Sequence, residues 1–282
     1  MSVSQTVYLN GEFLPIDEAK VSVLDRGFIF GDGIYEVVPV YAGKLFRWPE
    51  HLARLKRSLA KIRIQNPKDD AGWTELVNDL IKRHAWRDQF VYLQITRGVA
   101  KRDHAFPRDV SPTVFGMSSE FMPVPAIQRT QGVAAISIPD ERWLHCDIKS
   151  TSLLGNVLAR QAAVDANAIE CVMFRDGMLT EGSASNWWVI RHGTVLGPPR
   201  DNLILEGIRV SLMSQLCASA AIPLDIRRIT REEVFLADEL MISSATKELL
   251  PVTLLDGKPV GTGLPGPIYQ RLYEAYQHAK SA

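Results

Sequence analysis

The sequence has no long apolar run, no excess of either charge and few cysteines, and each absence excludes a class of protein. No window in the 282 residues approaches about eighteen consecutive apolar positions, so no membrane-spanning helix is predicted. Lysine plus arginine and aspartate plus glutamate both number 32, which argues against a surface for nucleic acid. The three cysteines are widely spaced without a CxxC pair, so neither a disulfide framework nor a structural zinc site is expected.

Several catalytic signatures are also missing. No GxGxxG motif opens a helix, which disfavours a dinucleotide site, and no GxSxG motif provides a serine nucleophile. Histidine and glutamate show no metal-ligand spacing, so no metal is expected. Residues 1–5 have neither the charge nor the apolar stretch of an export signal, and together with the cysteine usage this predicts a cytoplasmic protein. The balanced charge is compatible with self-association.

Local patterns predict a mixed α+β chain. Asn10-Gly11 between two β-rich runs is typical of a hairpin turn. Residues 49–64 have a proline in the first turn and one leucine-rich stripe, which predicts an amphipathic helix. Residues 25–33 are rich in glycine and aromatics and are expected to form an ordered loop. A helix is expected at 152–167, with Ser152 as its N-cap and its leucines and valine buried.

The length suits two modest domains better than one. Residues 119–131 contain two prolines and few periodic apolar positions, so we expect them to connect two α+β domains. The predicted domains are a smaller one at 1–118 and a larger one at 132–282.

A lysine and a carboxylate about thirty residues apart give the first indication of chemistry. Lys149 is preceded by Ile148 and lies close to Cys146, an apolar setting in which a lysine can supply the free amine needed for carbonyl chemistry. If Glu181 lies near it, this carboxylate could hold the pyridinium nitrogen of a pyridoxal ring. Alone, each has an ordinary interpretation: most lysines are solvated, and Glu-Gly-Ser is often a turn.

Three further positions could bind a phosphate. Arg54 lies on the predicted helix 49–64, where it also fits a solvated face. Gly207 precedes a helix predicted to begin at Ile208, and a helix N-terminus with a glycine before it is a ready phosphate site or a simple turn. Ser244 belongs to a hydroxyl cluster after a strand, which is usually turn chemistry.

A second set of residues could bind a carboxylate. Arg102 and His104 alternate, so on an extended loop they would point the same way. With the phenol of Tyr35 they could form a carboxylate trap. Taken alone, the pair is more simply explained as an exposed basic loop.

The motifs combine into a series found in one family. They are Asp25 to Glu36, Pro49 to Arg54, Arg142 to Ser150, and Thr180 to Asn186. In this order the chain resembles the fold type IV pyridoxal-phosphate aminotransferases over nearly its whole length, and most closely those acting on D-amino acids. The resemblance implies a two-domain α+β fold and a transaminase that moves the amino group between D-amino acids and 2-oxo acids such as 2-oxoglutarate or pyruvate.

The resemblance also implies roles for the candidate residues. Lys149 would carry pyridoxal 5′-phosphate as a Schiff base and shuttle a proton, and Glu181 would pair with the pyridinium nitrogen. Arg142 and Ser185 would support Glu181. The remaining coenzyme contacts would come from Arg54, Leu205, Gly207, Ile208, Arg209, Ser244 and Ala245.

Tyr35, Arg102 and His104 match the carboxylate trap of the D-amino acid subgroup. In relatives, Arg102 and His104 would come from the partner subunit, which implies a homodimer with shared active sites. The trap would fix which face of Cα presents its hydrogen to Lys149. The sequence departs from the family in having Arg209-Val210 after Ile208 and alanine at 245, which leaves fewer hydroxyl donors for the phosphate.

Other functions remain open at this point. An L-branched-chain or (R)-amine transaminase and an aminodeoxychorismate lyase have the same fold, but they would lack the pairing of Arg102 with His104. A coenzyme-free scaffold protein is the alternative outside enzymes, and the presence of both Lys149 and Glu181 argues against it.

Overall fold

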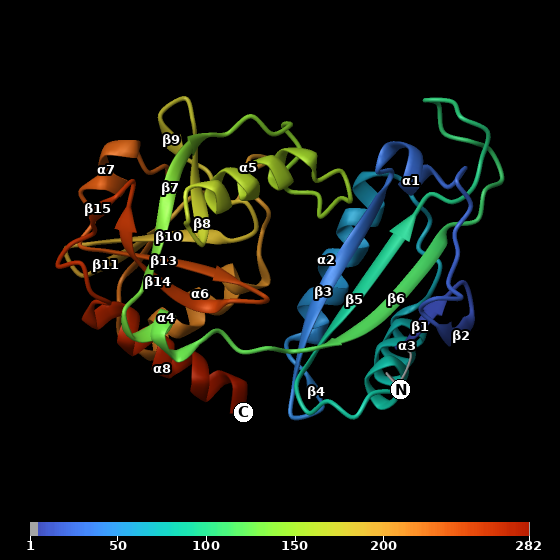
Figure 1. The fold of residues 1–282 in the computed structure, drawn as a ribbon, viewed down its shortest axis with the longest axis horizontal. Coiled ribbons are helices and arrows are strands. Elements are labelled where there is room, and N and C mark those ends of the chain that lie inside the picture. Colours follow the sequence, from blue (N-terminus) through green and yellow to red (C-terminus); the bar gives the residue numbers. More distant parts are fainter. Residues whose placement is uncertain (1–4, 282) are drawn as a thin grey trace. The chain divides into compact units, whose positions relative to one another are not determined.

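The computed structural model describes residues 5–281, apart from the side chains of Arg209, Val210 and Ser281, and the chain forms two compact units (Figure 1). Unit 1 consists of Met1–Met122 and Ile148–Leu153, and unit 2 of Pro123–Asp147 and Leu154–Ala282. Lys149 therefore belongs to the first unit, although unit 2 residues flank its segment on both sides. The predicted domain limits stay a prediction.

Unit 1 is built on one antiparallel sheet with the strand order β2-β1-β6-β5-β3-β4. Its strands are β1 (Thr6–Leu9), β2 (Glu12–Pro15), β3 (Gly33–Tyr41), β4 (Lys44–Leu45), β5 (Gln89–Thr96) and β6 (Thr113–Glu120). The predicted hairpin is confirmed, because Leu9 pairs with Glu12 across the turn. Asn10 and Gly11 both take positive φ, as this tight turn requires.

The described part of unit 1 has three helices, namely α1 (Arg26–Phe30), α2 (Trp48–Lys61) and α3 (Asp70–Lys82). The helix expected at 49–64 is α2, and its leucine stripe packs with α3 against the sheet. The ordered loop expected at 25–33 is wrong in part, since residues 26–30 are helical. The Asp25 carboxylate accepts a hydrogen bond from the Gly27 amide at 2.7 Å, and Gly31 closes the helix in the left-handed region, so short-range capping stabilises this turn.

Unit 2 contains a mixed sheet with the path β12-β11-β10-β13-β14-β7-β8-β9, and β15 pairs with β14. The pairs β11–β12, β14–β7 and β7–β8 are parallel and the others antiparallel. The strands are β7 (Val133–Pro139), β8 (Glu170–Arg175), β9 (Met178–Leu179), β10 (Asn186–Arg191), β11 (Thr194–Gly197), β12 (Leu224–Ile226), β13 (Glu239–Ser244), β14 (Glu248–Leu255) and β15 (Lys258–Pro259).

The helices of unit 2 pack against this sheet or against each other. They are α4 (Ala126–Thr130), α5 (Leu154–Asp165), α6 (Ile208–Ser219), α7 (Arg231–Phe235) and α8 (Pro267–Ser281). Helix α5 covers β7 and β8, and α8 contacts α6, β13 and β14. No helix in residues 5–281 is long and apolar enough to cross a membrane.

The orientation predicted for the helix near residue 152 is wrong. Helix α5 buries its small residues Ala159 and Ala163, whereas Leu154, Val157 and Leu158 are 72%, 58% and 63% exposed. The alanine side fits closely against β7 and β8, which leaves the larger apolar side uncovered. Ser152 is not the N-cap of α5, because the helix begins only at Leu154, and the Ser152 hydroxyl donates to the Gly31 carbonyl at 3.0 Å.

A carboxylate on a strand caps the C-terminal helix of unit 2. Glu239, at the start of β13, accepts hydrogen bonds from the amides of Ile268 and Tyr269 in the first turn of α8, at 2.9 and 2.8 Å. These amides have no partner within the helix, and the carboxylate also faces the positive end of the helix dipole. This contact ties α8 to the sheet.

We therefore expect Glu239→Gln to lower the free energy of unfolding by about 1–2 kcal/mol, because the amide retains only one acceptor oxygen and no charge. Thermal or denaturant unfolding measures the loss. Glu274→Gln, on the exposed side of α8, is the matched control and should be nearly neutral. Equal losses in the two variants would contradict the capping role of Glu239.

Candidate functional site

Lys149 is held against β3 and α2 by its backbone. Its carbonyl accepts a hydrogen bond from the Tyr35 amide at 2.9 Å, and its amide donates to the Ser58 hydroxyl at 3.4 Å. The next residue, Ser150, forms a β-bridge with Ile34. The side-chain amine lies 4.1 Å from the centroid of the Tyr35 ring. The structure thus brings two predicted site residues, Lys149 and Tyr35, into contact.

Arg54 lies in the same unit and makes a buried ion pair that the sequence analysis missed. Its Nε and Nη2 donate to the two carboxylate oxygens of Glu36 at 2.7 and 2.8 Å, and His51 Nδ1 lies 2.9 Å from Glu36 Oε2. Burial raises the pKa of Glu36, but Arg54 and His51 lower it further, so that it ends well below its usual range. This pairing fixes the Arg54 guanidinium rigidly on α2.

The side chains of Arg102 and His104 both contact Phe30 on α1. Both side chains are exposed on the loop between β5 and β6. The Arg102 guanidinium and the His104 ring each lie 5.4 Å from the centroid of Phe30. The structure therefore brings these two predicted residues together on one aromatic ring, and their described contacts do not include Tyr35.

In unit 2, Glu181 and Arg142 form a buried ion pair. Arg142 Nη1 donates to Glu181 Oε1 at 2.5 Å, and the Leu205 amide donates to Oε2 at 3.1 Å. Arg142 is itself held by the carboxylate of Asp140, at 2.9 and 3.0 Å. Three predicted residues, Glu181, Arg142 and Leu205, are therefore neighbours.

The Glu181 carboxylate is incompletely neutralised. Burial raises its pKa to about 7, although Arg142 and the Leu205 amide both lower it. Arg142 divides its charge between Glu181 and Asp140, which explains why it does not offset the desolvation of Glu181. A further cation placed against Glu181 would stabilise its ionised form.

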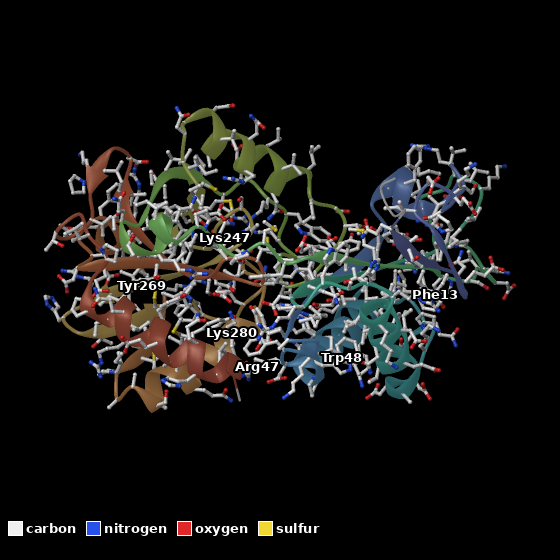
Figure 2. The ribbon with its side chains drawn as sticks, turned by 60° about the horizontal axis from the view of Figure 1, so that its bottom comes forward. Phe13, Arg47, Trp48, Lys247, Tyr269 and Lys280 are labelled. Atoms are coloured by element: carbon white, nitrogen blue, oxygen red, sulfur yellow. The ribbon has the colours of Figure 1, made fainter. Side chains whose placement is uncertain are left out.

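A second buried carboxylate, Glu170, holds the turn that follows Glu181. Glu170 accepts hydrogen bonds from the Ser183 amide at 3.0 Å, from the Ser183 hydroxyl and from the Ser185 hydroxyl at 2.8 Å. Lys247, labelled in Figure 2, has its amine 3.7 Å from Glu170 Oε2. Ser185, predicted as a supporting residue, is buried, and its hydrogen bond to Glu170 helps to hold this turn in place.

The other residues predicted to bind phosphate lie in unit 2, at the start of α6 and at the end of β13. Gly207 is the N-cap of α6. Because glycine has no side chain, it offers no acceptor to the first-turn amides, which start with Ile208. The hydroxyl of Ser244, at the end of β13, accepts from the Lys247 amide at 3.0 Å and lies 3.3 Å from Thr246 Oγ1. Ala245 begins the turn after Ser244. The side chain of Arg209 lies outside the described part of the structure.

Asn186 links these segments. It pairs with Ser243 of β13, and its side-chain amide donates to the Leu205 carbonyl at 3.1 Å. The loop of Leu205 is therefore anchored both to the end of β10 nearest Ser244 and to Glu181.

The functional residues that the sequence analysis missed are acidic partners, namely Glu36, Asp140 and Glu170. Glu36 and Glu170 stand in strands that are otherwise largely apolar, and a charged residue in such a strand signals a buried partner. The identity of each partner depends on contacts across the fold, so the sequence pattern could indicate only that one exists.

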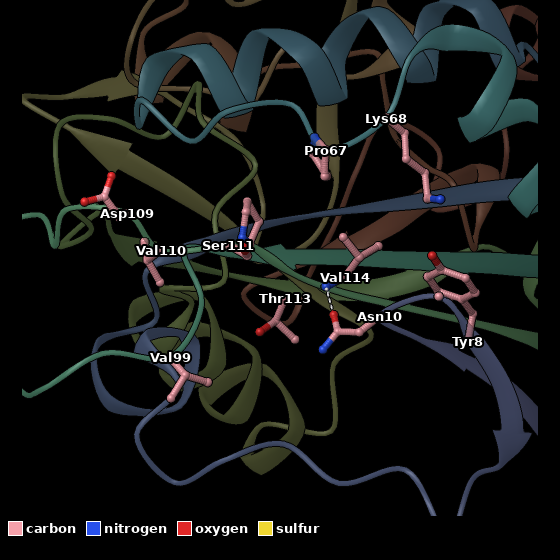
Figure 3. Close-up of a pocket in the computed structure, with 12 residues that line it drawn as sticks. Tyr8, Asn10, Pro67, Lys68, Val99, Asp109, Val110, Ser111, Thr113 and Val114 are labelled. Atoms are coloured by element: carbon pink, nitrogen blue, oxygen red, sulfur yellow. Dashed lines mark hydrogen bonds between the residues drawn. The ribbon is translucent and has the colours of Figure 1, made fainter.

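A pocket of about 560 Å³ in unit 1 lies elsewhere, against β1 and the loop that precedes β6 (Figure 3). Tyr8, Lys68 and Asp109 are among the residues that line it, whereas Lys149, Tyr35 and Arg54 are not. No group of three or more histidine, cysteine or acidic side chains within residues 5–281 could hold a metal ion.

Comparison with known proteins decides the family. The model of the family "Amino-transferase class IV" matches residues 33–255. The chain belongs to this family. It is 38% identical to the D-alanine aminotransferase of Bacillus licheniformis over 273 residues, which cover 97% of this chain and 96% of that one. It is 40% identical to the D-alanine aminotransferase of Staphylococcus aureus strain MSSA476, covering 97% of both chains.

The fold agrees with this assignment. The structure superposes on the branched-chain amino acid aminotransferase of Escherichia coli with a TM-score of 0.93 and 23% sequence identity, covering 98% of this chain and 94% of that one. The resemblance to fold type IV aminotransferases and the α+β class are therefore confirmed. As a member of the family, the chain is a pyridoxal-phosphate-dependent aminotransferase.

The residues present fit this coenzyme. Glu181 is a buried carboxylate whose pKa, raised to about 7, would fall on binding a pyridinium cation. The start of α6 offers backbone amides and the positive end of a helix dipole, which suit a phosphate. Lys149 supplies an amine on a fixed backbone.

Because the pKa of Glu181 is raised, the stability of the coenzyme-free protein should depend on pH. The pKa is about 7 in the folded chain against 4.5 for the free group, so folding takes up a proton between these values. The contribution of Glu181 to stability should be greatest below pH 4.5, and about 3 kcal/mol of it should be lost as the pH rises to 7.

The measurement is denaturant unfolding of the wild type and of Glu181→Gln, both free of coenzyme, between pH 4.5 and 8. The free energy of the wild type relative to the variant should fall across this range and then level off. A difference that is independent of pH would contradict the raised pKa.

Proposed function

We propose that the chain is a D-amino acid transaminase, which moves the amino group between D-amino acids and 2-oxo acids such as pyruvate or 2-oxoglutarate. The observation that carries this proposal is the contact of Lys149 with Tyr35, where the amine lies 4.1 Å from the ring centroid. Tyr35 is one of the three residues expected to bind the substrate carboxylate. The near-full-length similarity to D-alanine aminotransferases supports the same substrate class.

The side chains have separate tasks in this proposal. Bound pyridoxal phosphate supplies an electron sink that stabilises negative charge at the substrate Cα. Lys149 would hold the coenzyme through its amine and would move a proton to and from the substrate Cα. Glu181, kept in place by Arg142, would pair with the pyridine nitrogen and favour its protonated form.

The phosphate would be held at three places. Arg54 provides a guanidinium fixed by Glu36, and Gly207 and Ile208 provide the start of α6. Ser244 contributes a hydroxyl, Ala245 a backbone group, and Arg209 follows in the same helix turn. Leu205, bonded to Glu181 through its amide, would lie beside the ring.

Tyr35, Arg102 and His104 would select the enantiomer. If the α-carboxylate is bound on one side only, the hydrogen on Cα can face Lys149 in one configuration but not in the other. Selection would then depend on where the carboxylate is held rather than on the substrate side chain.

We infer that the enzyme acts as a homodimer, with Arg102 and His104 serving the active site of the partner subunit. Helix α5 leaves Leu154, Val157 and Leu158 more than half exposed, which is unusual for three large apolar residues on one helix. A second copy of the chain would cover them. The cysteine usage makes the cytoplasm the expected compartment.

A branched-chain L-amino acid transaminase is the second candidate, because enzymes of that kind share this fold. Because that similarity is at 23% identity, it reflects the fold, whereas the relatives at 38–40% identity are D-alanine aminotransferases. The pairing of Arg102 with His104, which a branched-chain L-amino acid transaminase would lack, distinguishes the two candidates.

The direct test is the visible absorbance of the purified, coenzyme-loaded protein before and after addition of D-alanine, with L-leucine in a parallel cuvette. The band should be lost with D-alanine and kept with L-leucine. Borohydride reduction of the same sample should fix the coenzyme on the peptide that contains Lys149, and Lys149→Ala should show no turnover. Loss of the band with L-leucine instead would overturn the D-amino acid assignment.

Arg102→Ala should lower kcat/KM for D-alanine by the equivalent of ~2–4 kcal/mol, because a charge-assisted contact to the carboxylate is removed. The reaction with an amine that has no carboxylate should change far less. An equal loss with both kinds of donor, measured by steady-state kinetics, would count against the carboxylate trap.

A further inference from the structure

Arg26 on α1 binds the backbone of the loop that presents Arg102 and His104. Its Nη1 donates to the carbonyls of Asp103 at 2.5 Å and Ala105 at 3.3 Å, and its Nη2 donates to the carbonyl of His104 at 3.4 Å. The residue is only 3% exposed. Three successive carbonyls of an otherwise exposed loop therefore converge on one buried guanidinium.

The orientation of this guanidinium is fixed from its other side. Arg26 Nε donates to Asp32 Oδ2 at 2.8 Å, and Arg97 binds the two oxygens of Asp32 at 2.8 and 2.9 Å. Arg97 also donates to the carbonyls of Ile62 and Arg63 after α2, at 2.7 and 3.1 Å. Burial raises the pKa of Asp32, but Arg97 and Arg26 lower it further, so its carboxylate stays charged.

Phe30 extends the same support to the side chains. The Arg26 guanidinium lies 4.8 Å from the centroid of its ring, and Arg102 and His104 lie 5.4 Å from it. Contacts of cations with an aromatic face are attractive and depend on direction. Arg26 and Phe30 thus support both the backbone and the side chains of the loop.

The C-terminal end of α1 is bonded to the segment that follows Lys149. The Thr151 hydroxyl donates to the Gly31 carbonyl at 2.8 Å, and the Thr151 amide donates to the Gly33 carbonyl at 3.0 Å. A Cβ on Gly31 would lie 2.7 Å from the Ser152 hydroxyl oxygen, so the two segments touch. Helix α1 therefore makes direct contacts with both the Arg102 loop and the Lys149 segment.

We propose that Arg26 is a positioning residue for recognition of the substrate carboxylate, acting by fixing the backbone of residues 103–105 so that Arg102 and His104 are presented in one arrangement. The inference rests on the proposed function, because Arg102 and His104 are assigned to the carboxylate there. Arg26 does not itself touch the substrate. Its five N–H donors in a rigid plane allow the carboxylate of Asp32 and three carbonyls to be bound together, which a lysine ammonium cannot do.

The test is Arg26→Lys, which keeps the charge but loses the planar array of donors. Single-turnover loss of the coenzyme absorbance should be measured with D-alanine and with ethylamine, which is D-alanine without its carboxyl group. The apparent second-order rate constant for D-alanine should fall roughly tenfold or more, since a displacement of about 1 Å at a binding group has effects of this size. The rate with ethylamine should change less than about threefold, because no carboxylate is bound.

A readout independent of turnover is hydrogen exchange of the peptide spanning residues 99–110. Its exchange should be faster in Arg26→Lys than in the wild type, while exchange in unit 2 is unchanged. The matched control is Arg227→Lys, because Arg227 also binds a carboxylate, that of Glu233, and a carbonyl, that of Arg228. This control should leave both rates and the 99–110 peptide as in the wild type.

Arg102→Ala, run alongside, separates failure of this inference from failure of the proposed function. If Arg102→Ala affects D-alanine and ethylamine equally, the proposed carboxylate trap fails. If Arg102→Ala is selective for D-alanine but Arg26→Lys slows both donors equally, or leaves the 99–110 peptide unchanged, the positioning role of Arg26 is overturned and the proposed function stands.

Discussion

Buried carboxylates need cations or donors around them, and this constraint shapes both units of the chain. In unit 1, the buried Glu36 is paired with Arg54 and contacts His51, and the partly buried Asp32 is paired with Arg26 and Arg97. An unpaired charge in such positions would cost several kcal/mol, so these side chains have little freedom to move. Rigid guanidinium groups follow directly from this pairing, and rigid groups are what recognition of a phosphate or a carboxylate requires.

Glu181 is the exception among these buried carboxylates. The pKa of Glu36 ends far below that of a free carboxyl, whereas the pKa of Glu181 rises to about 7 in an equally buried setting. The difference arises because Arg54 binds Glu36 with two nitrogens, while Arg142 gives one nitrogen to Glu181 and two to Asp140. A carboxylate left short of positive charge is suited to a cationic ring nitrogen, and one that is fully neutralised is suited to orienting an arginine.

How much the sequence could predict depended on the range of the contacts involved. The Asn10-Gly11 hairpin and the leucine stripe of α2 arise from near neighbours, and both were predicted correctly. Lys149 and Glu181 could be proposed as site residues because they stand in motifs. The pairing of Glu36 with Arg54, and that of Glu170 with Ser183 and Ser185, joins residues 13 to 18 positions apart through folded strands and helices, and no local pattern specifies it.

The error at α5 has the same origin and carries the most information. A rule that places large apolar residues inside predicted Leu154, Val157 and Leu158 on the buried face, but the adjacent sheet accommodates only the alanine side. The rule assumes that a helix is buried by its own chain. Three large apolar residues exposed on one face of a helix are unfavourable in water, so such a face usually marks a surface that another molecule covers. The homodimer proposed above would cover this face, and it would also place the exposed Arg102 and His104 at the active site of the partner subunit.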